Sequence, residues 1–116
     1  MNAGELRITN WLTDEDGKHY RIATGKNIDD VVKSKGIRLI PEILEKCGFR
    51  IEFNRASRFF GPHNSLVLEI FPDGSTNLYL NKEGSEPTTL PNNIIYLHQL
   101  QNLFYALCSE ELQVEL

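Results

Sequence analysis

The sequence predicts an α+β domain: a small antiparallel β-sheet or partly open barrel plus a β-meander, one short middle helix and a C-terminal helix packed on a sheet. Short runs of strand-forming residues are separated by turn residues, and apolar residues recur at helical spacing in two places. The predicted strands and helices lie in separate blocks and do not alternate as βα units, which favours α+β. With 116 residues and 41% hydrophobic content, the chain fits a single domain, residues 1–116.

An N-terminal β-hairpin is the first predicted element. Residues 6–12 and 18–22 are rich in strand formers, and residues 14–17, Asp-Glu-Asp-Gly, separate them. The aspartates do not predict a calcium site, because the other ligands and the late glutamate of an EF-hand loop are missing. The next segment, residues 27–35, fits either a short helix or a third strand, since its apolar spacing suits a helix and its adjacent valines suit a strand.

A short middle helix is predicted to begin at Pro41. Proline suits the first helical turn, and Glu42 lies at the positive end of the helix dipole. Gly48 can adopt the left-handed conformation that ends a helix, and Phe49 would then contact Leu44, as in a Schellman ending. We therefore expect a helix of about two turns that stops at the glycine.

The middle of the chain predicts an antiparallel β-meander. Strand-forming residues 50–53 and 66–71 stand on either side of a break at residues 61–64. Residues 72–74, Pro-Asp-Gly, are typical of a turn, and residues 75–80 resume the strand pattern. The meander contains no internal repeat and no low-complexity linker.

The C-terminal helix is predicted to begin between Asn93 and Leu97 and to end at Cys108. At helical spacing its apolar residues share an arc of roughly 140°, the width expected of a helix that lies on a sheet. These core-facing residues are Tyr96, Leu97, Leu100, Leu103, Phe104, Leu107 and Cys108. Each large apolar side chain buried on this face should contribute about 1.5–3 kcal/mol, so the helix is expected to be a main support of the domain.

The opposite face of this helix is uncharged. Residues 87–109 contain no Asp, Glu, Lys or Arg, although a chain that is 24% charged should place about five there. Amide and aromatic side chains are typical of protein interfaces, where charge is depleted, so this face is a candidate contact surface. The candidate interface residues are His98, Gln99, Gln101, Asn102 and Tyr105. Coverage of the face by other parts of the same chain explains the missing charges equally well.

Three segments resemble an uncharacterised family of small proteins encoded largely in phages and prophages of gut bacteria. They are residues 6–11, LRITNW, residues 43–49, ILEKCGF, and above all residues 96–107, YLHQLQNLFYAL. In this family we expect a hydroxyl residue to open the middle helix and a basic residue to precede the tyrosine, where this chain has Ile40 and Ile95. The resemblance implies a fold and a phage context, but no established activity.

Enzymatic and metal-binding motifs are absent from the sequence. It contains no glycine-rich phosphate loop, no Gly-x-Ser-x-Gly and no Cys-x-x-Cys, so we expect no catalytic residue, no metal site and no cofactor. Cys47 and Cys108 have no metal-ligand spacing and are expected to be free thiols. A signal peptide and an 18-residue apolar run are also missing, which predicts a cytoplasmic protein that does not enter a membrane.

A basic and aromatic segment provides an alternative. It runs from residue 50 to residue 63, and its nucleic-acid candidates are Arg50, Arg55, Arg58, Phe59, Phe60 and His63. Arginines bind phosphates and aromatic rings stack on bases, but a net charge of −4 argues against tight nonspecific binding. The main hypothesis is a non-enzymatic accessory or adaptor protein of phage or mobile-element origin that binds a protein partner or self-associates, with an inhibitor of host machinery as one version.

Overall fold

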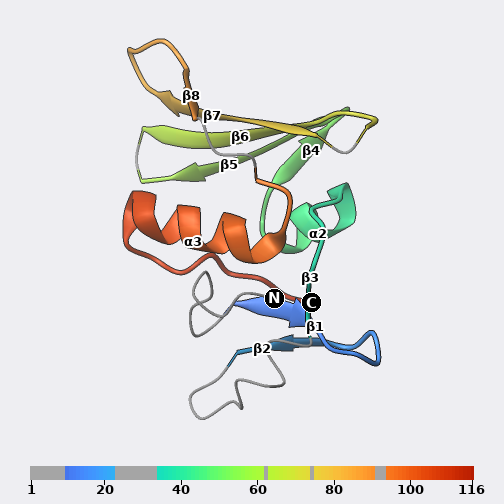
Figure 1. The fold of residues 1–116 in the computed structure, drawn as a ribbon. Coiled ribbons are helices and arrows are strands. Elements are labelled where there is room, and N and C mark those ends of the chain that lie inside the picture. The colour runs from blue at the N-terminus through green and yellow to red at the C-terminus, as the bar shows by residue number, and fades with distance from the viewer. Residues whose placement is uncertain (1–9, 23–33, 62, 74, 91–93) are drawn as a thin grey trace.

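The α+β fold is confirmed by a computed structural model, which describes residues 10–22, 34–61, 63–73, 75–90 and 94–116. Two antiparallel sheets, of three and five strands, lie on opposite sides of the C-terminal helix, and neither closes into a barrel (Figure 1). The elements of the N-terminal part are β1 (Trp11–Thr13), β2 (His19–Arg21), β3 (Lys35–Gly36) and α2 (Pro41–Lys46). They are followed by β4 (Arg50–Glu52), β5 (Arg55–Phe60), β6 (Asn64–Ile70), β7 (Thr76–Lys82), β8 (Thr88–Leu90) and α3 (Leu97–Cys108).

The three-stranded sheet has the order β2-β1-β3 and contains the predicted N-terminal hairpin. In its turn the Asp14 carboxylate accepts hydrogen bonds from the backbone N–H groups of Asp16 and Lys18, which is the role of a turn residue. Residues 6–9 of the predicted first strand lie outside the described residues. Residues 27–33 of the predicted helix or strand also lie outside the described residues, whereas Lys35, at the end of that segment, begins strand β3.

The end of α2 follows the predicted Schellman motif. Gly48 has a φ of +84°, the Phe49 N–H donates to the Leu44 carbonyl at 3.0 Å, and the Gly48 N–H donates to the Glu45 carbonyl at 3.0 Å. Ile40 stands at the N-cap without a side-chain hydrogen bond, so the signals at the start of the helix are Pro41 and the acidic Glu42 of the first turn.

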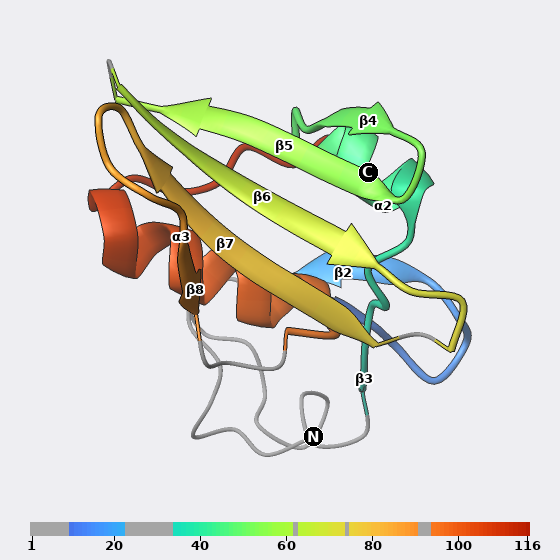
Figure 2. The same cartoon turned by 90° about the horizontal axis from the view of Figure 1, so that it is seen from above.

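The meander has five strands in the order β4-β5-β6-β7-β8 (Figure 2). The chain breaks between strands where the sequence predicts, because β5 ends at Phe60, β6 runs from Asn64 to Ile70 and β7 begins at Thr76, although Asn64 already belongs to β6. Three features of the meander were not predicted from the sequence: the strand β5, the two-residue turn Phe53-Asn54 that leads into it, and the short edge strand β8. Neither Phe53 nor Asn54 is followed by the glycine that usually announces a tight hairpin turn.

Helix α3 begins and ends within the predicted bounds, and its predicted core face is confirmed except for Tyr96, which is the half-buried N-cap residue. Leu97, Leu100 and Phe104 are buried, and Leu103 and Leu107 pack against the same core. This face lies on the inner side of the five-stranded sheet (Figure 1). The other side of α3 faces the three-stranded sheet, so the helix forms the middle layer of the molecule.

Candidate functional site

The polar face of α3 is largely enclosed by the chain itself. His98 is 1% exposed and Gln101 is 2% exposed. The Trp11 N–H donates to Gln101 Oε1 at 2.9 Å, and Asn10 Nδ2 donates to Asn102 Oδ1 at 3.0 Å. These contacts come from β1 and the residue before it. The absence of charge on this face therefore has an internal explanation, because buried amides that are hydrogen-bonded avoid the desolvation cost of full charges.

Strand β3 covers the polar face of α3 near the start of the helix. The His98 ring stacks on the Tyr96 ring, with centroids 5.8 Å apart and an angle of 10° between the planes. Gly36 lies directly against this pair, since a Cβ atom placed there would come within 2.8 Å of the Tyr96 ring. A glycine is needed here for close approach of the strand to the helix.

The other two interface candidates, Gln99 and Tyr105, have surroundings that differ from those of the enclosed residues. Gln99 Oε1 accepts hydrogen bonds from the backbone N–H groups of Ile95 and Tyr96 at 2.9 and 3.0 Å, so its side chain caps the start of α3. Tyr105 is 44% exposed and lies on the outside of the helix. Of the five candidates on α3, Tyr105 is thus the exposed residue that a partner could reach directly.

The basic and aromatic segment is divided between the two faces of the five-stranded sheet. Arg50 pairs with Ser57, and residues two apart on a strand share a face, which places Arg50, Arg55 and Phe59 on the outer face. Arg58 and Phe60 lie on the inner face and contact the Phe104 ring, with Arg58 Cζ at 4.7 Å and the Phe60 centroid at 6.0 Å.

The remaining candidate of this segment, His63, lies in the turn between β5 and β6 and pairs with Glu83.

The outer face of the five-stranded sheet carries carboxylates beside its arginines. Arg50 pairs with Glu52 at 3.3 Å, and Arg55 with Glu69 at 4.0 Å. Phosphate contacts depend on unbalanced positive charge, so this pairing weakens the face as a nucleic-acid site.

An exposed aromatic residue stands at the tip of the β4–β5 hairpin. Phe53 is 101% exposed and has a φ of +54°. Type II′ turns have a positive φ at this first central position and favour glycine there. A bulky residue in the left-handed region costs about 1–2 kcal/mol. Phe53 therefore combines backbone strain with complete exposure of an apolar ring. The sequence pattern placed this residue at the end of a strand and gave no signal of a turn.

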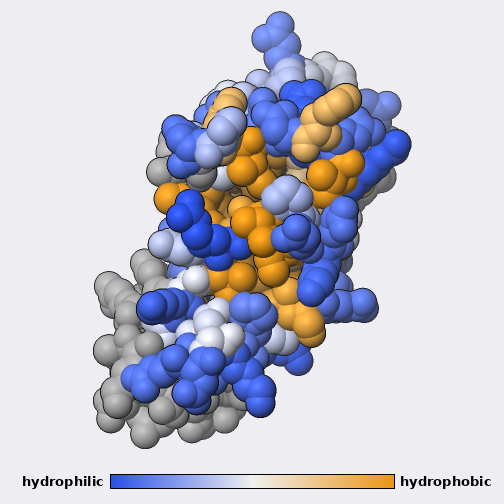
Figure 3. All heavy atoms as spheres, turned by 90° about the vertical axis from the view of Figure 1, so that its right-hand side faces the viewer, coloured by the Kyte–Doolittle hydropathy of each residue, from blue (hydrophilic) through white to orange (hydrophobic). Residues whose placement is uncertain are grey.

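Other apolar residues lie at the same end of the molecule as this tip. The Ile70 N–H donates to the Asn54 carbonyl at 2.8 Å, which joins the end of β6 to the hairpin turn. Half-buried Phe71 follows Ile70 in the chain. Figure 3 shows apolar side chains gathered on this side of the molecule, where α2 and the ends of the sheet strands lie. We call Phe53, Ile70 and Phe71 the apolar end.

The two cysteines are free thiols. Burial raises the pKa of Cys47 to about 12, although the nearby Arg58 acts in the opposite direction. Cys47 is therefore protonated at neutral pH and is a weak nucleophile. The Cys108 Sγ donates to the Phe104 carbonyl at 3.2 Å, as half-buried helical thiols often do. Within the described residues no group of three or more His, Cys, Asp or Glu side chains is arranged to hold a metal ion.

Searches of protein-family models, curated proteins and solved structures gave no match to this chain. Among the residues that the structure describes, no helix has the length and apolar character needed to span a membrane. Two of the segments that carry the family resemblance contribute to the surroundings of α3, because Asn10 and Trp11 bond to the helix and the buried residues of 43–49 share a core cluster with its apolar face. The resembling residues that are described thus make contacts inside the fold.

Proposed function

We propose that the protein is a non-enzymatic accessory or adaptor protein of phage or mobile-element origin that acts by binding another protein, for example as an inhibitor of host machinery. The observation that carries the binding role is Phe53, exposed and strained at the hairpin tip. The phage origin is supported only by the resemblance of residues 6–11, 43–49 and 96–107.

Phe53 strains the backbone of the isolated chain and contributes no burial energy to its stability. Its backbone conformation disfavours a residue with a Cβ atom, and its ring forgoes the roughly 1.5–3 kcal/mol that burial of a phenylalanine supplies. Strained residues persist where the strained conformation serves a function. An aromatic ring that projects from a rigid hairpin loses little conformational entropy when it enters a partner's pocket, which is the behaviour of an interface anchor.

The rest of the apolar end supplies the surroundings of such an anchor. Ile70 and Phe71, which the hydrogen bond from the Ile70 N–H to the Asn54 carbonyl places beside the hairpin turn, can exclude water around the ring. Arg50 and Glu52 flank the hairpin as polar groups. An apolar centre with a polar rim is the usual anatomy of a protein interface. The apolar end therefore replaces the enclosed polar face of α3 as the main candidate contact surface.

The test is the substitution Phe53→Gly. Glycine removes the strain but adds chain entropy to the unfolded state, so the free energy of unfolding should rise by about 0.5–1 kcal/mol. Binding should weaken by at least about 2 kcal/mol, roughly thirtyfold, because the anchor is lost. Urea denaturation measures the free energy of unfolding. To compare binding, tagged wild-type and variant proteins are tested for the proteins that each retains from a lysate of the host bacterium. Sedimentation tests whether the chain associates with a second copy of itself.

Phe59→Thr is the matched control, because Phe59 is also a highly exposed aromatic, 79%, but lies on the outer face of the sheet. Threonine keeps a strand-forming residue at that position. The proposal requires a protein, or a second copy of the chain, that wild type and Phe59→Thr retain and Phe53→Gly loses. Equal retention by all three proteins, or loss only with Phe59→Thr, contradicts it.

Binding of single-stranded nucleic acid is the second candidate, favoured by the exposed Phe59 beside Arg50 and Arg55 on an open sheet face. Aromatic rings on such a face stack bases. Fluorescence anisotropy with a labelled oligonucleotide should then show affinity that falls steeply with salt and drops further in Arg55→Ala. If the anisotropy stays at its unbound value at 20 mM salt, this candidate is excluded.

A further inference from the structure

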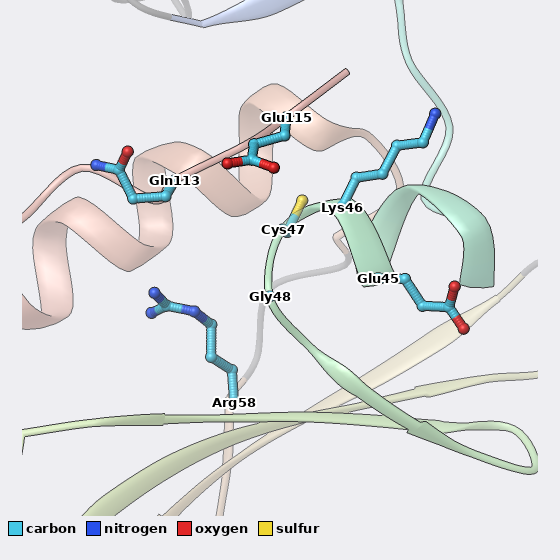
Figure 4. Close-up of a pocket in the computed structure, with 7 residues that line it drawn as sticks. All are labelled: Glu45, Lys46, Cys47, Gly48, Arg58, Gln113 and Glu115. Atoms are coloured by element: carbon cyan, nitrogen blue, oxygen red, sulfur yellow. The ribbon is translucent and has the colours of Figure 1, made fainter.

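A pocket of about 460 Å³ lies where the end of α2, strand β5 and the C-terminal tail meet (Figure 4). Its lining residues are Glu45, Lys46, Cys47, Gly48, Arg58, Gln113 and Glu115. A volume of this size is within the range of small-molecule sites in proteins. The protein-binding role proposed above does not use this pocket. None of the residues that line the pocket belongs to the apolar end.

Arg58 supplies positive charge to the pocket from an unusual position. It lies on the inner, core-facing side of β5, between Ala56 and Phe60. Its guanidinium carbon lies 4.7 Å from the centre of the Phe104 ring, which holds the group in place by a cation–π contact. In the described part of the chain no carboxylate forms an ion pair with it. A guanidinium held in this way offers its N–H edge to a carboxylate in bidentate geometry.

Glu115 supplies the opposite charge from the C-terminal tail. The Glu115 N–H donates to the Lys46 carbonyl at 3.0 Å, which fixes the tail beside the end of α2. Figure 4 shows the Glu115 carboxylate directed into the space between Gln113 and Cys47, which the Arg58 guanidinium approaches from β5. The charged ends of Lys46 and Glu45 point away from this space. One positive and one negative group therefore face the pocket.

The pocket wall between Arg58 and Glu115 is uncharged and lies close to the Arg58 guanidinium. The Cys47 thiol lines it in the protonated form, and Gly48 presents bare backbone. A Cβ atom at Gly48 would come within 3.3 Å of Arg58 Nε, so a larger residue there would crowd the guanidinium. The same glycine ends α2 with its φ of +84°.

We infer that this pocket binds a small aminocarboxylate, a molecule with one carboxylate and one ammonium group, with the carboxylate on Arg58 and the ammonium on Glu115. The opposite charges of Arg58 and Glu115 select aminocarboxylates over ligands with charge of one sign. A phosphate or a simple carboxylate would meet Arg58 favourably but would face the negative charge of Glu115, and a simple amine would face Arg58. The Gln113 amide, which also lines the pocket, can donate to the carboxylate or accept from the ammonium.

The binding test uses the full chain and ligands that differ only in charge and length. Isothermal titration and amide chemical shifts are recorded with glycine, 4-aminobutyrate and 6-aminohexanoate, and with butyrate, butylammonium and inorganic phosphate. At least one aminocarboxylate should bind roughly tenfold more tightly than butyrate, butylammonium or inorganic phosphate, because each of these carries charge of one sign only and loses a charge-assisted hydrogen bond. The amides of Gly48 and Glu115 should shift with the same affinity.

Two variants separate the charges and a third is the control. Glu115→Gln should remove the preference for 4-aminobutyrate over butyrate, and Arg58→Gln should weaken the binding of both by roughly tenfold. Glu45→Gln, on the rim with its side chain directed away, should leave the affinity within about twofold. Circular dichroism checks that Arg58→Gln folds, because the Arg58 side chain packs on the inner face of the sheet. If Arg58→Gln unfolds, Glu115→Gln still tests the inference, because Glu115 lies on the exposed tail.

The inference is overturned if no aminocarboxylate shifts the pocket amides, or if butyrate binds the wild-type chain as tightly as the tightest-binding of the three aminocarboxylates. An effect of Glu45→Gln equal to that of Glu115→Gln would also overturn it, because the selectivity would then come from general surface charge. Tighter binding of phosphate than of every aminocarboxylate would assign the pocket to anions and contradict the role of Glu115.

Discussion

Phe104→Ala should lower the free energy of unfolding by about 3–5 kcal/mol, the cost of truncating a buried aromatic side chain. The ring is 2% exposed, meets Phe60 edge to face at 70°, and carries the Arg58 guanidinium on its face. Its removal leaves a cavity between α3 and the inner face of the sheet and also withdraws the support of Arg58. Because a domain of this size is stable by about 5–15 kcal/mol, a large part of its stability would be lost.

Urea denaturation followed by circular dichroism measures this loss. Tyr105→Ala is the matched control, since it removes the neighbouring aromatic side chain, which is 44% exposed, and should cost less than about 1 kcal/mol. Equal losses for the two variants would mean that Phe104 does not lie at the centre of the core.

Gln101→Glu should lower the free energy of unfolding by about 3 kcal/mol or more at neutral pH, because it buries an uncompensated charge. Gln101 is 2% exposed, and its side-chain oxygen accepts the Trp11 N–H that joins β1 to α3. A carboxylate of the same shape can accept that bond, but it loses its hydration between the helix and the three-stranded sheet. We expect the hairpin of β1 and β2 to detach first, since this contact anchors it.

The measurement is thermal melting at several protein concentrations, with Gln113→Glu as the control. Gln113 is exposed on the C-terminal tail, so the same chemical change there should leave the melting temperature almost unaltered. A loss with Gln101→Glu that disappears on dilution would indicate that a second copy of the chain covers this face. A loss that is independent of concentration supports enclosure by the chain's own sheet.

The two helices were predictable from the sequence because their signals are local. Pro41, Gly48 and Phe49 determine the start and the end of α2 within nine residues, and the Schellman hydrogen bonds are those that the spacing predicts. The core face of α3 follows from periodicity in the same way. The positions of most strands were also predictable, since residues 61–64 and 72–74 carry turn residues.

The candidate sites depended on register and on long-range contacts, which local patterns do not contain. The turn at Phe53 has none of the residues that favour a tight hairpin, so the sequence did not reveal that β4 ends there. Without that turn, the division of Arg50, Arg55 and Phe59 from Arg58 and Phe60 could not be assigned, because a shift of one residue reverses the faces of a strand.

The sequence by itself determined the class of fold, the bounds of α2 and α3 and the uncharged character of residues 87–109. Only the tertiary structure decided what that uncharged face contacts. Gln101 bonds to Trp11 across 90 positions of the chain, and the pocket joins Arg58 to Glu115 from separate segments. Capping and periodicity act between neighbours in sequence, whereas burial of the polar face requires the docking of a second sheet, and that is fixed by packing among distant residues.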